Sequence, residues 1–294
     1  MSSILSLQDA HVSIIGMGLM GASLGYDLRG HCRRVTGVVR RPEAVAATVA
    51  SGCVDAATLD AASAVSQADI VILSTPVRTI LRQIEDLGPL MKPGSVLLDM
   101  GSTKTEICRK MAALPEYIQP VGGHPMCGKE VAGLDAAESG LYRGCTFVLC
   151  PLPRTSSSAL ALTLELVSLI QARPLFLEPE RHDRLVAAIS HLPYLSATAL
   201  VWHVMRMAEE DPTVWEVAAS GFKDSSRVAA SDVRMLLDIL MTNREAVLEA
   251  MDEFAERLTA LRDALDKGDE ETLRIQLENI AQARRNWQKN RDPH

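Results

Sequence analysis

The sequence has few of the features that mark several large classes of protein. Aromatic residues make up 4% of its 294 residues, and its six cysteines form no CxxC pair. Scattered cysteines are typical of reduced thiols, so we expect a cytoplasmic protein without a disulfide framework. Cys127 lies three residues after His124, but no further set of metal ligands accompanies this pair. We therefore expect no metal.

Charge and hydrophobic pattern exclude further classes. The formal net charge is −7 and the isoelectric point is near 5.6, which argues against a nucleic-acid surface. No apolar run approaches the roughly 20 residues of a membrane span. The first ten residues lack the basic flank and apolar core of a signal peptide. We expect a small-molecule partner, with neither nucleic acid nor membrane.

A glycine fingerprint follows the first short β-type run. Residues 11–15 are apolar-rich, and the sequence GMGLMG follows at once, before an apolar helical stretch. The glycines let the backbone approach a pyrophosphate, and the free N–H groups at the helix start bind it. Strand, fingerprint and helix in this order predict a dinucleotide site formed by Gly16, Gly18, Leu19, Met20 and Gly21.

The residues after the next β-type run predict which dinucleotide binds. Residues 35–39 are followed by Arg40 and Arg41, where an acid would bind the ribose 2′-hydroxyl of NAD. Guanidinium groups bind a 2′-phosphate in two-pronged fashion, so the pair favours NADP over NAD. The alternative interpretation is two solvated loop arginines. Thr75 and Pro76 follow another buried run and are expected beside the nicotinamide ribose.

Alternating strand and helix patterns continue to residue 177, and only helical patterns follow. This predicts an α/β protein with an N-terminal Rossmann-type doubly wound sheet over residues 1–177 and an all-helical dimerisation and substrate domain over 178–294. The remaining strands are expected at 69–73, 95–99, 117–121, 145–150 and 174–177. Pro193 should kink the long helical pattern of residues 182–207, because proline cannot donate to a helical carbonyl.

Polar residues cluster where strands are expected to end. Ser102 and Thr103 follow one strand; they fit helix N-caps, or a ligand site at the carboxyl edge of the sheet. His124 follows another strand within the sequence VGGHPMCG. Glycine permits unusual backbone angles and Pro125 stiffens the segment, so we expect His124 to be presented on a rigid loop.

Two helical seams near the C-terminus predict self-association. Apolar residues recur there at spacings of three and four, and a small helical region cannot easily enclose them all. We therefore expect a homodimer. The seam residues are Val247, Met251, Phe254, Leu258, Leu261 and Leu265, then Leu273, Leu277, Ile280 and Trp287.

Five segments together resemble the prephenate/arogenate dehydrogenase family of tyrosine biosynthesis. They read GMGLMGASLGYDL, DMGSTK, GGHPMCG, SHLPY and FKDSSRVA, in the order and context typical of that family. The resemblance covers nearly the whole chain, and we expect no chorismate mutase segment before it. It implies oxidative decarboxylation of prephenate, arogenate or both, with hydride transfer to NADP.

The resemblance also implies catalytic roles. His124 would accept the proton of the ring hydroxyl with assistance from Ser102, and its titration is expected near the free-histidine value of about 6.5. Arg227 would hold a substrate carboxylate, with Lys223 nearby and His191 lining the pocket.

The chain departs from the family pattern in two places. The segment that ends at Arg227 reads KDSSR where RDxTR is common, which keeps the basic residues but leaves the role of Lys223 open. The other departure is in a loop. Many members have Thr, Ser or Pro where this chain has Lys129, followed by Glu130. Both side chains are expected to touch the substrate side chain. Because they differ from the usual pattern, the choice between prephenate and arogenate stays open.

Two other classes of protein fit parts of the sequence. A β-hydroxyacid dehydrogenase also joins a Rossmann domain to helices, but it would carry a catalytic lysine on a helix of the second domain. A non-catalytic redox sensor that binds NADP would explain the fingerprint and the dimer. It would not explain why Ser102, His124, His191 and Arg227 occur together.

Overall fold

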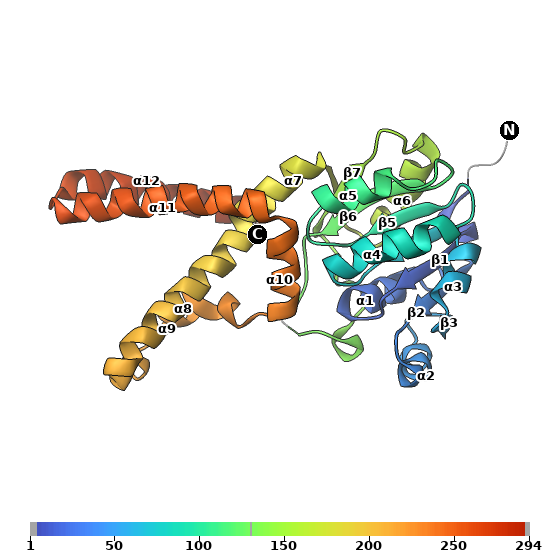
Figure 1. Cartoon of the computed structure of the whole chain (residues 1–294), viewed down its shortest axis with the longest axis horizontal. Coiled ribbons are helices and arrows are strands. Elements are labelled where there is room, and N and C mark those ends of the chain that lie inside the picture. The colour runs from blue at the N-terminus through green and yellow to red at the C-terminus, as the bar shows by residue number, and fades with distance from the viewer. Residues whose placement is uncertain (1–4, 130, 292–294) are drawn as a thin grey trace. The chain divides into compact units, whose positions relative to one another are not determined.

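A computed structural model describes residues 5–129 and 131–291 (Figure 1). Its N-terminal part is an eight-stranded sheet in the order β3-β2-β1-β4-β5-β6-β7-β8. The strands are β1 His11–Ile15, β2 Arg34–Val38, β3 Ala56–Thr58, β4 Ile70–Leu73, β5 Val96–Asp99, β6 Gln119–Pro125, β7 Thr146–Pro151 and β8 Arg173–Phe176.

The strand directions confirm the expected doubly wound sheet. Strands β1 to β6 pair in parallel, β7 pairs antiparallel with β6, and β8 is parallel to β7. Strand order reverses between β1 and β4, where such sheets bind ligands beyond the carboxyl ends of their strands. The sequence prediction missed β3, a three-residue strand whose side chains are only half-buried.

Helices cover the sheet, so its central strands are buried on both faces. Every residue of β1, β4 and β5 is buried. The helices of this part are α1 Leu19–Leu28, α2 Pro42–Ala50, α3 Ala61–Gln67, α4 Val77–Leu87, α5 Thr105–Ala112 and α6 Ser157–Leu169. Two apolar clusters pack around the strands and fix the strand ends in place.

A helical segment follows β8 and returns to the sheet. It comprises α7 Pro179–Val186, a π-helical turn η4 Ala187–His191, α8 Leu192–Glu210, α9 Ser220–Ser226, a 3₁₀ turn η6 Arg227–Ala230 and α10 Val233–Thr242. A π turn precedes Pro193, since the missing proline N–H leaves the carbonyl four residues earlier without its usual helical donor. The kink expected at Pro193 stays a prediction. Helix α10 packs on α4, where Ile239 enters the core.

The contacts of the chain divide into two compact units, one ending at Arg244 and one beginning at Glu245. The domain boundary expected after residue 177 stays a prediction. The second unit comprises most of α11 Arg244–Asp266, together with α12 Glu270–Arg291. Gly268 has a positive φ between them, and Asp269 accepts a hydrogen bond from the Thr272 N–H, as expected for a helix cap. The seam residues Leu258, Leu277 and Ile280 are exposed.

The expectation that no segment matches a membrane span needs correction. The helical run Pro179–Glu210 is long and apolar enough to cross a membrane by length and composition alone. Its first helix buries His182 and Asp183 in polar contacts with His124 and Lys104, and His191 is buried against Asn243. The exposed apolar side chains of α8, among them Trp202 and Met205, are also what a helix of a subunit interface presents.

Candidate active site

The glycine fingerprint forms a cradle at the carboxyl end of β1. Gly16 has φ of +103°, and a Cβ there would lie 2.6 Å from the Ser74 carbonyl oxygen. A Cβ on Gly21 would lie 2.0 Å from the Gly16 carbonyl oxygen. Only glycine fits these two positions, because helix α1 begins pressed against the turn that precedes it. Gly18 differs, since space for a Cβ is open there.

This cradle fits a dinucleotide pyrophosphate. Gly18 is the N-cap of α1, and no side chain of the described residues caps the helix there, so its first N–H groups are available to an anion. The buried hydroxyl of Ser74, at the end of β4, also has no hydrogen-bond partner among the described residues. Thr75 donates to Gln83 over 2.7 Å, and Pro76 is the N-cap of α4. Leu19 and Met20 form the first turn of α1.

Arg40 and Arg41 lie just beyond the carboxyl end of β2, and both are exposed. Arg41 is the N-cap of α2 and lies 3.6 Å from the Glu43 carboxylate, with both side chains largely in solvent. An exposed pair of this kind is weak. Both guanidinium groups can therefore turn towards a ligand phosphate.

A buried ion pair fixes the edge of the sheet next to His124. Lys104 and Asp99 are both fully buried and in contact, and the Lys104 ammonium also donates to the Gly123 carbonyl over 2.6 Å. The other Asp99 oxygen accepts the Gly123 N–H at 3.0 Å. A Cβ on Gly123 would lie 2.4 Å from the Asp99 carbonyl oxygen. Gly123 is thus required by close packing, and not by a positive φ.

His124 lies in strand β6 and not on a loop after it. The strand runs on to Pro125 because His124 pairs with Val148 of the antiparallel strand β7. The expectation of a rigid loop was wrong here, because pairing with a later strand is not visible in the local pattern. The strand holds the imidazole at the ligand-binding edge of the sheet.

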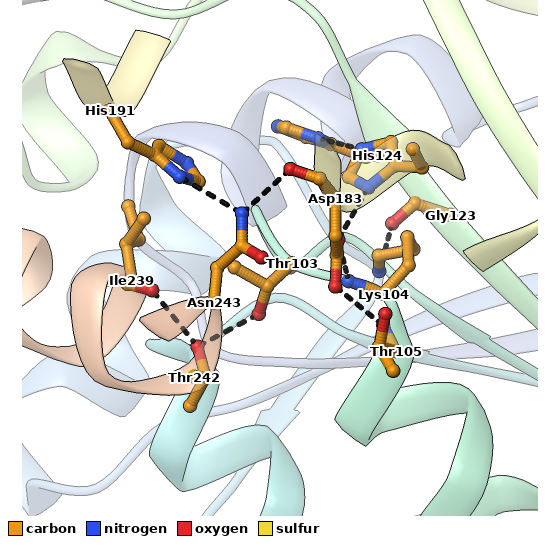
Figure 2. Close-up of polar contacts among 12 residues, drawn as sticks. Thr103, Lys104, Thr105, Gly123, His124, Asp183, His191, Ile239, Thr242 and Asn243 are labelled. Carbon is orange, nitrogen blue, oxygen red and sulfur yellow. Dashed lines mark hydrogen bonds and ion pairs between the residues drawn. The ribbon is translucent and has the colours of Figure 1, made fainter. Parts of the chain in front are cut away.

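The imidazole of His124 begins a chain of hydrogen bonds that the sequence analysis missed (Figure 2). His124 Nδ1 lies 2.8 Å from His182 Nε2, and His182 Nδ1 lies 2.7 Å from the Asp183 carboxylate. His182 and Asp183 are almost completely buried. The adjacent pair His-Asp near the start of a helix was the only signal in the sequence, and such pairs are common on solvated helices.

Asp183 also caps helix α5. Its two carboxylate oxygens accept the N–H groups of Lys104 and Thr105, over 2.7 and 2.8 Å. This finding replaces the expected capping by Ser102 and Thr103. The Thr103 hydroxyl instead lies 2.9 Å from that of Thr242 on α10. A carboxylate at this helix start is favoured by the helix dipole.

Asn243 connects His191 to the same group. Its amide nitrogen donates to the Asp183 carbonyl over 2.8 Å, which fixes the orientation of the amide. The same nitrogen lies 3.1 Å from His191 Nδ1, which must therefore accept. His191 thus carries its proton on Nε2 and is a hydrogen-bond donor there.

Burial keeps the two histidines neutral. Burial, followed by the nearby charges of His182, Lys104 and His191, holds the pKa of His124 well below the ordinary 6.5. Burial lowers the pKa of His191 to about 4, although Asp183 opposes the shift. The titration expected near 6.5 for His124 is corrected to lower pH.

Asp183 stays ionised at the centre of the group. Burial alone would raise its pKa, but hydrogen bonds from His182 and from the N–H groups of Thr105 and Lys104 bring it below its usual value. The site therefore combines one carboxylate with two neutral imidazoles.

The remaining residues predicted for the site are Ser102, Lys129, Glu130, Lys223 and Arg227. Ser102 is half-buried just after β5. Lys129 is held in its own loop by the Ala136 carbonyl, at 3.0 Å, and by Glu138, at 2.9 Å. Glu130 lies outside the described residues.

Lys223 and Arg227 lie apart from the histidines. Both line an open groove of about 580 Å³ along α8, with Val201 and Phe222. Val201 follows His191 by ten residues, which is roughly 15 Å along a helix axis at 1.5 Å per residue. Figure 1 shows α9 beside α8. The described contacts of one chain thus bring His124 and His191 together, and place Lys223 and Arg227 on a neighbouring surface.

Comparison with known sequences gives this arrangement a family. The model of the prephenate dehydrogenase nucleotide-binding domain matches residues 24–175, and that of the prephenate dehydrogenase dimerization domain matches residues 178–279. The chain belongs to the prephenate dehydrogenase family. Prephenate dehydrogenase of Bacillus subtilis is 30% identical over 266 residues, or 89% of this chain and 72% of that protein. Cyclohexadienyl dehydrogenase of Zymomonas mobilis is 31% identical over 278 residues, covering 93% and 94%.

Comparison with solved structures gives the same family. Prephenate dehydrogenase from A. aeolicus, in complex with hydroxyphenyl propionate and NAD+, superposes with a TM-score of 0.88 at 31% identity, covering 96% of this chain and 99% of that one. Synechocystis arogenate dehydrogenase gives 0.82 at 28% identity, covering 94% and 99%. A 3-hydroxyisobutyrate dehydrogenase of Salmonella typhimurium gives 0.55 at 17% identity, covering 86% and 95%, and shares the fold alone.

Proposed function

We propose that this protein oxidises and decarboxylates prephenate, arogenate or both, in tyrosine biosynthesis. The observation that carries the proposal is a neutral histidine, His124, held at the ligand edge of a dinucleotide-binding sheet. Among the relatives, two are named prephenate dehydrogenases and one an arogenate dehydrogenase, and the arogenate dehydrogenase structure covers 94% of this chain.

The chemistry needs one base and one hydride acceptor. His124 accepts the proton of the ring hydroxyl, while the hydride on the same carbon departs and a carbonyl begins to form. The C–C bond to the ring carboxylate then breaks, its electrons enter the ring, and CO2 leaves as the ring becomes aromatic. The bound dinucleotide supplies the hydride acceptor.

NADP is the proposed cofactor. The match to a nucleotide-binding domain and the NAD+ complex of a relative support a pyridine nucleotide. Arg40 and Arg41 follow the end of β2, and the two residues before them, Val38 and Val39, are not acidic. A carboxylate there would repel a 2′-phosphate, whereas these two side chains attract it. Gly16, Gly18 and Gly21 provide the pyrophosphate cradle.

His191, Arg227 and Lys223 are proposed to bind the substrate. His191 presents a donor nitrogen, which suits a carboxylate or carbonyl oxygen of the substrate. Arg227 is proposed to hold a substrate carboxylate, and Lys223 to add positive charge. Ser102 is proposed to assist His124, and Lys129 to contact the substrate side chain.

The protein is proposed to work as a soluble, cytoplasmic homodimer. The second family domain is named a dimerization domain, and the exposed apolar side chains of α8, α11 and α12 are consistent with burial against a second copy. Neither a membrane nor a nucleic acid is proposed as a partner.

A β-hydroxyacid dehydrogenase is the second candidate, because the fold is shared. It requires a lysine on a helix after the sheet. The only lysine between residues 178 and 244 is Lys223, which is exposed. A non-catalytic NADP-binding redox sensor would give no reason for two neutral histidines at the sheet edge.

The deciding experiment is a side-by-side assay. NADP+ reduction is followed with prephenate, with arogenate and with a panel of β-hydroxyacids, and the released CO2 is measured. Reduction with equal release of CO2 is expected for at least one cyclohexadienol. Reduction with a hydroxyacid alone would favour the second candidate, and no reduction with any substrate would favour the sensor.

A further inference from the structure

The hydrogen-bond chain behind His124 carries an inference about which nitrogen is the base. An imidazole can accept a proton from the substrate only through a nitrogen that carries none. His124 Nδ1 is occupied by His182 at 2.8 Å, so Nε2 is the nitrogen left for a substrate. The question is whether Nε2 is unprotonated.

The charge state of Asp183 decides the proton positions. This carboxylate receives the N–H groups of Lys104 and Thr105, and its pKa lies below the usual value. An ionised carboxylate only accepts, so His182 Nδ1 must carry a proton and donate it over 2.7 Å. With that single proton on His182, its Nε2 is then an acceptor.

His124 has to provide the donor for that acceptor. Its Nδ1 therefore carries the proton, and its Nε2 keeps a free lone pair. The opposite assignment would either leave His182 Nδ1 without a proton against the carboxylate, where two acceptors repel each other, or put a second proton, and so a full positive charge, on the buried His182. Two N–H groups at the start of α5 hold the Asp183 carboxylate in place. The hydrogen bonds from His124 through His182 therefore all point towards this carboxylate.

We propose that His182 and Asp183 are positioning residues that hold His124 with its proton on Nδ1, so that Nε2 is ready to accept the substrate proton. This relay rests on the proposed function, because it assigns the state of the base used there. When Nε2 takes the hydroxyl proton, the cation that forms is stabilised through His182 by the Asp183 charge. A wrong tautomer in a comparable carboxylate–histidine pair costs about 10⁴-fold in kcat.

The first test measures tautomers directly, in the unmodified enzyme without substrate. Histidine-selective ¹⁵N NMR near neutral pH should show His124 with a protonated Nδ1 and a bare Nε2. A protonated Nε2 would overturn the relay. If the expected tautomer is present and neither prephenate nor arogenate is oxidised, the relay stands and the proposed function fails. An active enzyme with the opposite tautomer gives the reverse result.

The second test compares two variants of His182. His182→Gln keeps an oxygen that can accept from His124 Nδ1, whereas His182→Leu fills similar volume without an acceptor. We expect kcat to fall about 10–100-fold in the Leu variant and less than about tenfold in the Gln variant, with little change in KM. The Leu variant should also move His124 towards the Nε2-protonated tautomer. Equal losses that follow the thermal midpoints of both variants would reduce His182 to a packing residue and overturn the proposal.

Discussion

The candidate site has a cofactor-binding half and a substrate-binding half, and the two are formed by different parts of the residues. The cofactor half uses backbone: a glycine at φ +103°, a helix start and the close approach of Gly21 to Gly16. The substrate half uses buried side chains whose partners lie far apart in the chain, such as His124 and His182, 58 residues apart. Backbone sites tolerate few residue types, whereas side-chain sites depend on exact protonation. The two halves should therefore fail in different ways.

The largest expected effect is in the substrate half. His124→Asn keeps a polar group in β6 but removes the proton acceptor, so kcat should fall about 10²–10⁴-fold. Cofactor affinity should stay unchanged, because the glycine cradle is not touched. Titration of NADP+ binding by fluorescence, together with steady-state kinetics, measures both.

The pH profile separates chemistry from packing. In the unmodified enzyme, kcat/KM should fall only well below pH 6.5, since burial lowers the pKa of His124. The Asn variant should lack this acid limb. A fully active Asn variant, or one that loses thermal stability and keeps the acid limb, would contradict the role of His124 as the base.

Arg227 tests whether the neighbouring groove belongs to the substrate half. Arg227→Ala should raise KM about 10–150-fold, because a charged hydrogen bond contributes about 1.5–3 kcal/mol. Arg227→Lys should recover only part of this, since a point charge lacks the two-pronged guanidinium geometry. NADP+ affinity should not change.

Arg206→Ala, on the exposed part of α8, is the matched control and should be nearly silent. Equal losses of substrate and cofactor binding in Arg227→Ala would indicate a structural arginine. Dimers mixed from His124→Asn and Arg227→Ala chains would further show whose site Arg227 serves. Activity returns only if it acts on the partner's site.

The cofactor half has one expected side-chain contribution, the arginines after β2. Arg40→Asp should lower or reverse the preference for NADP over NAD in kcat/KM, by about 10–150-fold for one charge-assisted contact. Arg34→Asp places the same charge change at the opposite end of the same strand and should leave the preference unchanged. An unmodified enzyme that prefers NAD would refute the NADP assignment.

The glycines allow a finer test of the backbone half. A Cβ on Gly21 collides with the Gly16 carbonyl, whereas a Cβ on Gly18 meets open space. Gly21→Ala should therefore lower both the thermal midpoint and NADP+ affinity. Gly18→Ala should leave the midpoint unchanged and weaken NADP+ binding about tenfold, or roughly 1.4 kcal/mol, because its methyl group faces the pyrophosphate. Unchanged affinity in Gly18→Ala would place the pyrophosphate elsewhere.

The same contrast explains what the sequence could predict. The pyrophosphate cradle could be predicted from the sequence because closely spaced glycines after a strand serve few structural purposes. His124 could also be predicted as a candidate site residue, from the two glycines and the proline around it. In the structure, Gly123 is needed for close packing against Asp99. Both signals are local.

The support of His124 could not be predicted, because it depends on tertiary contacts. Asp183 lies 78 residues from the Thr105 N–H that it caps, and Asn243 lies 52 residues from His191. Nothing local separates these polar residues from solvated ones on other helices. Ser102 and Thr103 looked like caps for the same reason, since a local cap is the simpler expectation.

The last expected effect is on the pH dependence of stability. His191 has a folded pKa of about 4, against about 6.5 when unfolded, and the pKa of His124 is lowered as well. Below pH 6.5 the unfolded chain therefore binds more protons than the folded one. The stability from the neutral histidines is complete above pH 6.5 and is lost as the pH falls towards 4.

Each histidine should contribute a slope of about 1.4 kcal/mol per pH unit to the free energy of unfolding in this window. Asp183 does not interfere, because its lowered pKa acts only below the usual aspartate range of about 3.9. His191→Asn keeps an oxygen that can accept from Asn243 and should remove one histidine's share of the slope. His31→Asn, on the surface, should leave the slope unchanged. Urea unfolding at several pH values measures it. A slope that is the same in both variants would mean that His191 is protonated in the folded protein and cannot be the neutral donor described above.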